Sequence, residues 1–244
     1  MNGRVIAVLR KEFREYRRNK LIVFTMAGVP IIFFVLIALG TFGLPEDAPP
    51  GLIRSAVGQT LLFFLLIPVI LPTTVAAYSI IGEREQGTIE PVLTTPVTDR
   101  ELLSAKALAA VLPSVLLAWA MFVLYVVLAA AVAPQTVVDR ILAPDQIVAQ
   151  LVMAPALAGF AIVVSILISL RSTDIRVAQQ LSGLASFPVL GLLALGSFEV
   201  VRPSITLYVV AAAAIAAIDL AGWRLAVRLF DPERLLTRYG APGV

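Results

Sequence analysis

The sequence contains no cysteine and no histidine, and both absences limit its chemistry. Without cysteine the chain forms no disulfide bond, and without either residue it lacks the usual ligands of zinc, haem and iron–sulfur clusters. Catalytic centres that need a histidine base or a cysteine nucleophile are excluded for the same reason. The sequence also has no G-x-x-x-x-G-K-[ST] phosphate loop, so we do not expect it to hydrolyse ATP by that route. No metal or cofactor is expected to bind this chain.

Charge is also scarce, because only 14% of the 244 residues are charged and 59% are hydrophobic. A soluble domain carries about 25% charged residues, and it must cover its core with polar surface. The mean hydropathy of +0.95 leaves more apolar surface than such a fold can bury, and a lipid bilayer is the solvent that accepts it. The composition therefore excludes an ordinary soluble enzyme and predicts a membrane protein.

Six apolar runs are long enough to cross a bilayer as helices, for which roughly 20 residues are needed. They cover about 21–42, 60–81, 107–133, 147–170, 177–198 and 204–223. Asp219 is the one charged residue within these runs, as the cost of placing charge in lipid requires. We therefore predict an all-α membrane protein with six transmembrane helices, forming a single transmembrane domain over residues 1–244.

Lysine and arginine residues fall almost entirely on one side of the six expected spans. Of the 19 basic residues, only Arg54, Arg140 and Arg202 lie in loops on the opposite side. The positive-inside rule then places both termini in the cytoplasm. The basic residues flank apolar runs, so we expect them to contact membrane lipid, and we expect no nucleic acid partner.

Residues 1–20 combine strong basic charge with an apolar stripe. One side of a helical wheel collects the apolar residues Val5, Ile6, Leu9, Phe13 and Tyr16. The other side is basic, and this pattern predicts an interfacial amphipathic helix that leads into the first span. Two alternatives stay open. One is a signal peptide, against which Glu12, Glu15 and the length of the apolar run argue; the other is a solvated leader that only fixes topology.

The segment 82–106, between the second and third spans, is the least lipid-like stretch in the middle of the chain. Thr98 and Glu101 form a T-x-x-E capping box, which predicts that a helix begins at Asp99 and continues into the third span. Gly87 and Pro96 interrupt the part before it. A structured, charged segment on the cytoplasmic face fits a docking surface for a soluble partner. An ordinary solvated loop is the alternative.

This segment contains Glu83, Gly87-Thr88, Glu90, Val92-Leu93, Thr95-Pro96, Glu101-Leu102-Leu103 and Lys106. The run closely resembles the signature between the second and third spans of type-2 permeases of ATP-binding-cassette (ABC) transporters. The N-terminal helix, the six spans and the charged cytoplasmic tail within 224–244 are similar to that family as well. The resemblance implies a coupling helix that inserts into a groove of an ATPase subunit. The matched candidates for that contact are Glu83, Arg84, Glu85, Gly87, Thr88 and Glu90.

The resemblance implies a transport subunit rather than an enzyme, in the plasma membrane of a prokaryote. Its expected partners are two ABC ATPase subunits, which bind the ATP, and a second copy of this permease or a related one. Export is the expected direction. Substrate-binding residues are not predicted, because spans rich in Leu, Val, Ala and Phe suit both an apolar cargo and a lipid-facing surface.

Two other classes of function stay open at this point. Asp219 could serve a proton relay in a gradient-driven secondary transporter, but the spans hold no second carboxylate and no histidine to complete the relay. An intramembrane enzyme could use neither a Ser–His pair nor paired aspartates, and only a Ser–Lys arrangement is left.

Overall fold

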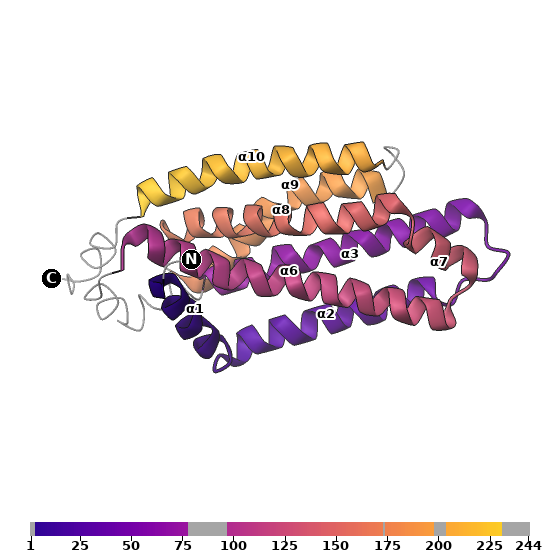
Figure 1. The fold of residues 1–244 in the computed structure, drawn as a ribbon, viewed down its shortest axis with the longest axis horizontal. Helices are drawn as coiled ribbons and strands as arrows, with labels where there is room; N and C mark the ends of the chain where they lie inside the picture. Colours follow the sequence, from indigo (N-terminus) through magenta and orange to yellow (C-terminus); the bar gives the residue numbers. More distant parts are fainter. Residues whose placement is uncertain (1–2, 78–96, 173, 198–203, 231–244) are drawn as a thin grey trace.

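The computed structural model describes residues 3–77, 97–172, 174–197 and 204–230, which form helices and no strands (Figure 1). In chain order the helices are α1 (Gly3–Tyr16), α2 (Lys20–Thr41), α3 (Pro50–Ala77), α6 (Asp99–Val132), α7 (Gln135–Ile141), α8 (Pro144–Ser169), α9 (Ile175–Ser197) and α10 (Ile205–Leu229). The all-α prediction is confirmed.

A helix occupies each of the six ranges expected to span a membrane. Over the described residues, four of these helices are long and apolar enough to do so: Pro50–Ala76, Arg100–Val132, Pro144–Ser169 and Ile205–Leu229. Within α2, the described residues also contain the shorter apolar stretch Pro30–Thr41. The number of six membrane-spanning helices stays a prediction.

The helix limits differ from the hydropathy ranges in two places. Helix α3 begins at Pro50 rather than near residue 60, and its first turns bury Ile53 and Val57 while Leu52 and Arg54 stay exposed. Helix α7 was expected as loop, yet it buries Val137, Val138 and Ile141 on one side. Both features are too short or too polar on one face to raise a hydropathy average.

Helices α3 and α8 lie at the centre of the bundle. Helix α3 contacts α2, α6, α8 and α9, and α8 contacts α3, α6, α9 and α10. Helix α1 lies at a steep angle to α2 at one end of the bundle, where α3 and α10 end and α6 begins; we call this the α1 end (Figure 1). The opposite end, which holds α7, is the α7 end.

Helices α8 and α10 approach closely because each presents a glycine. A Cβ atom at Gly159 of α8 would lie 2.6 Å from Asp219 Oδ2, and a Cβ atom at Gly222 of α10 would lie 2.5 Å from Val163 Cγ1. Real Cβ atoms essentially never come this near, so a side chain at either position would force the opposing Asp219 or Val163 side chain to shift. Small residues that permit such contact are common between membrane helices.

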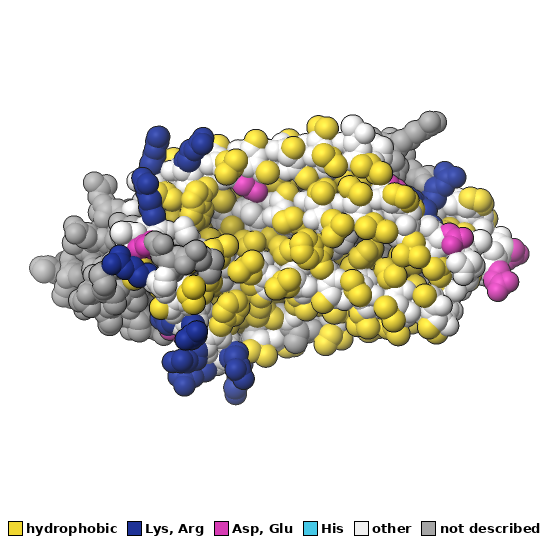
Figure 2. All heavy atoms as spheres, viewed as in Figure 1, with side chains coloured by type: hydrophobic (Ala, Val, Ile, Leu, Met, Phe, Trp, Pro, Cys, Tyr) yellow, Lys and Arg dark blue, Asp and Glu magenta, His cyan; other side chains and the backbone are white. Residues whose placement is uncertain are grey.

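The outer surface of the bundle is apolar around its middle. Large hydrophobic side chains are exposed along α2, α6 and α10, including Leu39 at 76%, Val132 at 65% and Leu220 at 63%. Figure 2 shows this hydrophobic belt, with most of the visible lysine and arginine side chains at the α1 end. A belt of this kind suits contact with lipid acyl chains.

Candidate functional site

The start of α6 is fixed by the capping box that the sequence predicts. The Glu101 backbone N–H donates to Thr98 Oγ1 at 3.3 Å, and the Thr98 backbone N–H donates to Glu101 Oε2 at 3.0 Å. Two backbone donors at the helix N-terminus are thereby satisfied, which stabilises a helix that begins at Asp99. The predicted start of this helix is confirmed, and the first turn lies at the α1 end.

A buried ion pair joins α1 to the first turns of α6. Lys106 Nζ donates to Glu12 Oε1 at 2.8 Å, and the two side chains are only 6% and 1% exposed. Lys11 Nζ lies 4.0 Å from the same Glu12 oxygen, at the edge of the pair. Arg4 and Glu101 add a longer and more exposed contact of 3.9 Å between the same helices. Lys106 is the nearer of the two basic partners of Glu12, so the pair ties α1 to α6 through a buried charge.

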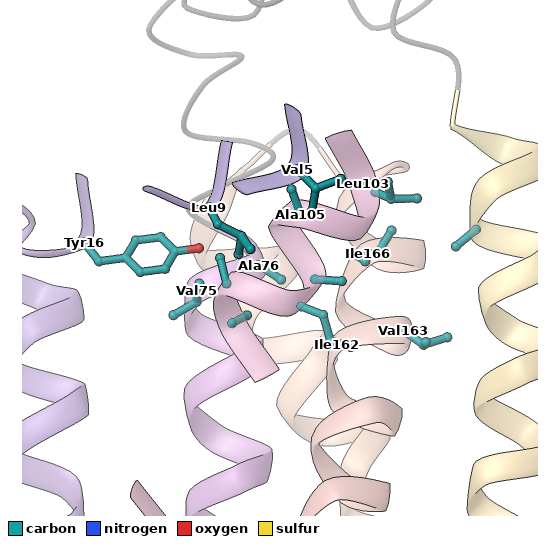
Figure 3. Close-up of a cluster of buried hydrophobic side chains, with 14 of the residues drawn as sticks. Val5, Leu9, Tyr16, Val75, Ala76, Leu103, Ala105, Ile162, Val163 and Ile166 are labelled. Atoms are coloured by element: carbon teal, nitrogen blue, oxygen red, sulfur yellow. The ribbon is translucent and has the colours of Figure 1, made fainter. Parts of the chain in front are cut away.

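Apolar packing continues this contact into the bundle. Val5, Leu9 and Tyr16 of α1 belong to one buried cluster with residues of α2, α3, α6, α8 and α10 (Figure 3). The cluster includes Ile22, Val75, Ala76, Leu103, Ala105, Ile162, Val163, Ile166 and Ala226. Helix α1 is therefore part of the core at this end. We call the Glu12–Lys106 pair and this cluster the α1–α6 junction.

The apolar stripe of α1 is partly buried in the bundle and partly exposed. Val5, Leu9 and Tyr16 pack into the junction, whereas Ile6 and Phe13 are 41% and 39% exposed. Both exposed side chains lie on α1. Phe13 lines a cavity of about 500 Å³ with Arg10 and Arg14 of α1 and with Arg17 and Arg18, which follow the helix. Residues 3–16 thus form a helix, and its apolar stripe lies partly against the bundle and partly on the exposed surface.

The six candidate contact residues, Glu83, Arg84, Glu85, Gly87, Thr88 and Glu90, lie outside the described residues. The described chain before them ends with α3 at Ala77, and the described chain after them resumes at Val97, one residue before the α6 cap. Both of these points are at the α1 end (Figure 1). The segment that contains the candidates is therefore attached beside the α1–α6 junction.

Glu12 is the functional-site residue that the sequence analysis missed. It was considered only as an argument against a signal peptide, and Lys106 only as part of the middle motif. One signal was available: Glu12 lies three residues after Leu9 and four before Tyr16, within the apolar stripe of the helical wheel. A carboxylate in such a stripe needs a basic partner when it is buried, and the sequence alone does not show which one.

The described helices also bury uncharged polar side chains outside the junction. Gln179 Nε2 donates to Thr74 Oγ1 at 2.9 Å and links α9 to the last turn of α3. The side-chain amide of Gln150 and the Oδ1 atom of Asp219 are buried without a hydrogen-bond partner among the described residues. In the same part of the chain, no three acidic side chains are grouped in a way that could hold a metal ion.

Long apolar helices, an exposed hydrophobic belt and charged ends define a multi-pass helical membrane protein. The sequence model of the family described as ABC-2 family transporter protein matches residues 8–178, and the chain belongs to this family. It is a membrane permease of the ABC transporter class, which confirms the resemblance carried by the middle motif. The match includes both Glu12 and Lys106. No curated protein matches the chain.

Proposed function

We propose that this permease is the membrane-spanning subunit of an ATP-driven exporter. Two permease subunits form the translocation path and work with two separate ATPase subunits, which bind and hydrolyse the ATP. Family membership supports this proposal, because ABC-2 permeases generally partner with ABC ATPases. The observation that carries it is the α1–α6 junction, which lies where the candidate coupling segment 82–106 is attached.

The proposal includes six spans, with both termini in the cytoplasm of a prokaryote. Its support is the charge distribution along the bundle: the arginines of α1 lie at the α1 end, whereas Arg54 and Arg140 lie at the α7 end. Positive charge is enriched on the cytoplasmic side of membrane proteins. The α1 end is then the cytoplasmic end, and α1 lies at the membrane interface with Ile6 and Phe13 toward lipid.

The junction offers a physical route for coupling. The ATPases act on the segment that contains Glu83, Arg84, Glu85, Gly87, Thr88 and Glu90, and that segment continues into α6. Because Lys106 of α6 holds the buried carboxylate of Glu12, a displacement of α6 moves α1 with it. The pair and the shared apolar cluster make α1 and the start of α6 one unit, which shifts between inward-open and outward-open arrangements of the bundle.

The combined substitution Glu83→Ala with Gly87→Pro tests this assignment. We expect the double variant to insert normally but to lose transport, because the helix that meets the ATPase is disrupted while the spans are untouched. Transport into inverted vesicles and ATPase stimulation are measured together. Glu46→Ala at the α7 end is the control, and it should leave both activities unchanged. Normal transport by the double variant would count against the assignment.

A gradient-driven secondary transporter is the second candidate function. The buried Oδ1 atom of Asp219, which has no hydrogen-bond partner among the described residues, is the observation that favours it. An intramembrane carboxylate is a common element of proton pathways. Replacement of Asp219 separates the two functions, as described below.

A further inference from the structure

A cleft at the α1 end lies between the start of α6 and the last turns of α10. Its volume is about 350 Å³, and it is lined by Arg100, Ser104, Trp223, Arg224, Val227 and Arg228. Two residues come from α6 and four from α10, helices that each pack mainly on other elements of the bundle. The family assignment does not explain why three arginines, a hydroxyl group and an indole ring line one cleft.

The three arginines bring positive charge to one cleft. Among the described residues, Arg100, Arg224 and Arg228 form no ion pair. Guanidinium groups held near one another repel, and a bound anion removes that repulsion. Arginine forms paired hydrogen bonds with phosphate oxygens, and the Ser104 hydroxyl can donate one more. The chemistry of the cleft therefore favours a phosphate group.

The apolar part of the cleft identifies the source of the phosphate. Trp223 and Val227 line the same cleft, and the neighbouring α10 residues Leu220 and Leu225 are 63% and 48% exposed. Along α10, the exposed Leu220 is followed by Trp223 and then by Arg224 and Arg228. Trp223 therefore lies between the hydrophobic belt and the arginines. Tryptophan is enriched at this level of a bilayer, where headgroups meet acyl chains. A free phosphate ion would gain nothing from the indole ring and the exposed leucines.

We propose that this cleft binds the headgroup of an anionic phospholipid, with the phosphate on the arginines and the acyl chains along α10. The bound lipid bridges α6 and α10. Arg100 lies next to the Glu101 that closes the α6 cap, so the lipid sits beside the start of the helix that leaves the coupling segment. The binding site does not depend on the proposed export function and is tested on the permease alone.

Fluorescence of Trp223 provides the test, because the chain has only two tryptophans. The full chain is reconstituted into nanodiscs that contain phosphatidylcholine and a small fraction of brominated lipid, which quenches tryptophan on contact. The Trp223→Phe variant gives the signal of Trp119, which is subtracted. We expect brominated phosphatidylglycerol to quench Trp223 at a mole fraction several times lower than brominated phosphatidylcholine.

The triple variant Arg100→Gln, Arg224→Gln, Arg228→Gln should abolish this preference. Each single substitution is expected to weaken phosphatidylglycerol binding about fivefold, the value for one basic residue at an anionic membrane surface. The matched control is Arg10→Gln, Arg14→Gln and Arg17→Gln together, which removes equal charge from the N-terminal segment at the same end of the bundle. This control should keep the preference. Helix content and elution as a single species establish that each variant is folded. If the triple variant fails to fold, Arg228→Gln alone tests the proposal through its fivefold loss.

Three results would overturn the proposal. Equal quenching by the two lipids would show that the cleft does not select an anionic headgroup. An equal loss in the N-terminal control would assign the preference to general surface charge. Relief of quenching by inorganic phosphate, but not by chloride at the same ionic strength, would assign the cleft to free phosphate. None of these results bears on ATPase coupling, so the failure of this proposal is distinct from a failure of the export proposal.

Discussion

The two ends of the bundle are closed by different chemistry. At the α7 end, Tyr125 stacks on Phe42 with ring centroids 5.2 Å apart, and its hydroxyl donates to Thr41 Oγ1 at 2.8 Å. Arg140 forms two hydrogen bonds of 2.8 Å with Asp145, only five residues away. At the α1 end, by contrast, the main polar contact joins Glu12 and Lys106, 94 residues apart in the chain. One end is held by aromatic contacts, a neutral hydrogen bond and a partly exposed ion pair, and the other by a buried charge pair.

The two ends are expected to differ in how much stability is lost when one contact is removed. Loss of one aromatic hydroxyl leaves the surrounding rings packed, and its cost is that of one hydrogen bond. Loss of one partner of a buried ion pair leaves the other charge buried without its nearest counter-charge. The α1 end is therefore the end at which a small displacement has large energetic consequences, as a coupling site requires. Four substitutions test or sharpen this comparison.

Lys106→Ala is expected to have the largest effect on stability. It leaves the Glu12 carboxylate buried beside α6, which costs about 3–5 kcal/mol of the free energy of unfolding in detergent. The combined change Glu12→Leu with Lys106→Leu should recover most of that loss, because apolar side chains of similar volume replace the pair. Glu15→Ala is the control: Glu15 is 49% exposed and pairs with Lys11 at 3.2 Å, which is worth about 0–1 kcal/mol. Equal losses for Lys106→Ala and Glu15→Ala would contradict the importance of the junction.

Gly222→Ala should have the next largest effect. The added Cβ would meet Val163 Cγ1 at 2.5 Å, and forcing α8 and α10 apart costs about 1–3 kcal/mol. Val163→Ala in the same chain should restore much of the stability by removing the opposing methyl group. Gly183→Ala in α9 is the matched control, because nothing lies within 4 Å of its Cβ position. Thermal unfolding in detergent measures all three, and the close approach of α8 and α10 would be refuted by equal melting of the Gly222 and Gly183 variants.

Tyr125→Phe probes the opposite end of the bundle. It removes the hydrogen bond to Thr41, whose hydroxyl still donates to the Ile37 carbonyl oxygen at 2.8 Å. The expected loss is about 0.5–1.5 kcal/mol, clearly smaller than that of Lys106→Ala. ATPase stimulation should be unchanged, because the proposed ATPase contact is at the opposite, α1 end. A loss as large as that of Lys106→Ala would remove the distinction between the two ends.

Asp219→Asn is expected to have the smallest effect on transport. The shape of the side chain is kept against Gly159, and the amide cannot take part in a proton relay. ATP-driven transport should therefore proceed at the normal rate and stay independent of a proton gradient. Uptake into inverted vesicles with and without an uncoupler measures both. Loss of transport in this variant, together with sensitivity of the native protein to the uncoupler, would favour the gradient-driven transporter.

Local signals in the sequence predict local structure in this protein. The hydropathy runs give the positions of the long helices, since each is decided by residues close in the chain. The capping box of Thr98 and Glu101 gives the start of α6 because all of its hydrogen bonds lie within three residues. The early start of α3 and the helix α7 were missed because their buried residues are few and interrupted by polar ones.

The α1–α6 junction is a long-range feature and could not be predicted in the same way. Nothing in the neighbourhood of Glu12 identifies Lys106 as its partner, because their approach depends on how α1 crosses the bundle. The arginine cleft depends in the same way on the packing of α10 beside α6. The resemblance of the middle motif identified the family, whereas the contacts that join this motif to the rest of the molecule required the fold.

The central claim is that this permease is driven by separate ATPase subunits at the α1 end, and co-purification tests it most directly. The tagged chain is purified from its own membranes in mild detergent, next to the Glu83→Ala, Gly87→Pro double variant, and the retained proteins are identified by mass spectrometry. We expect a P-loop ATPase in near-equal amount with the native chain and its loss from the double variant. Repeated absence of any such ATPase from an intact, folded native chain would contradict the account.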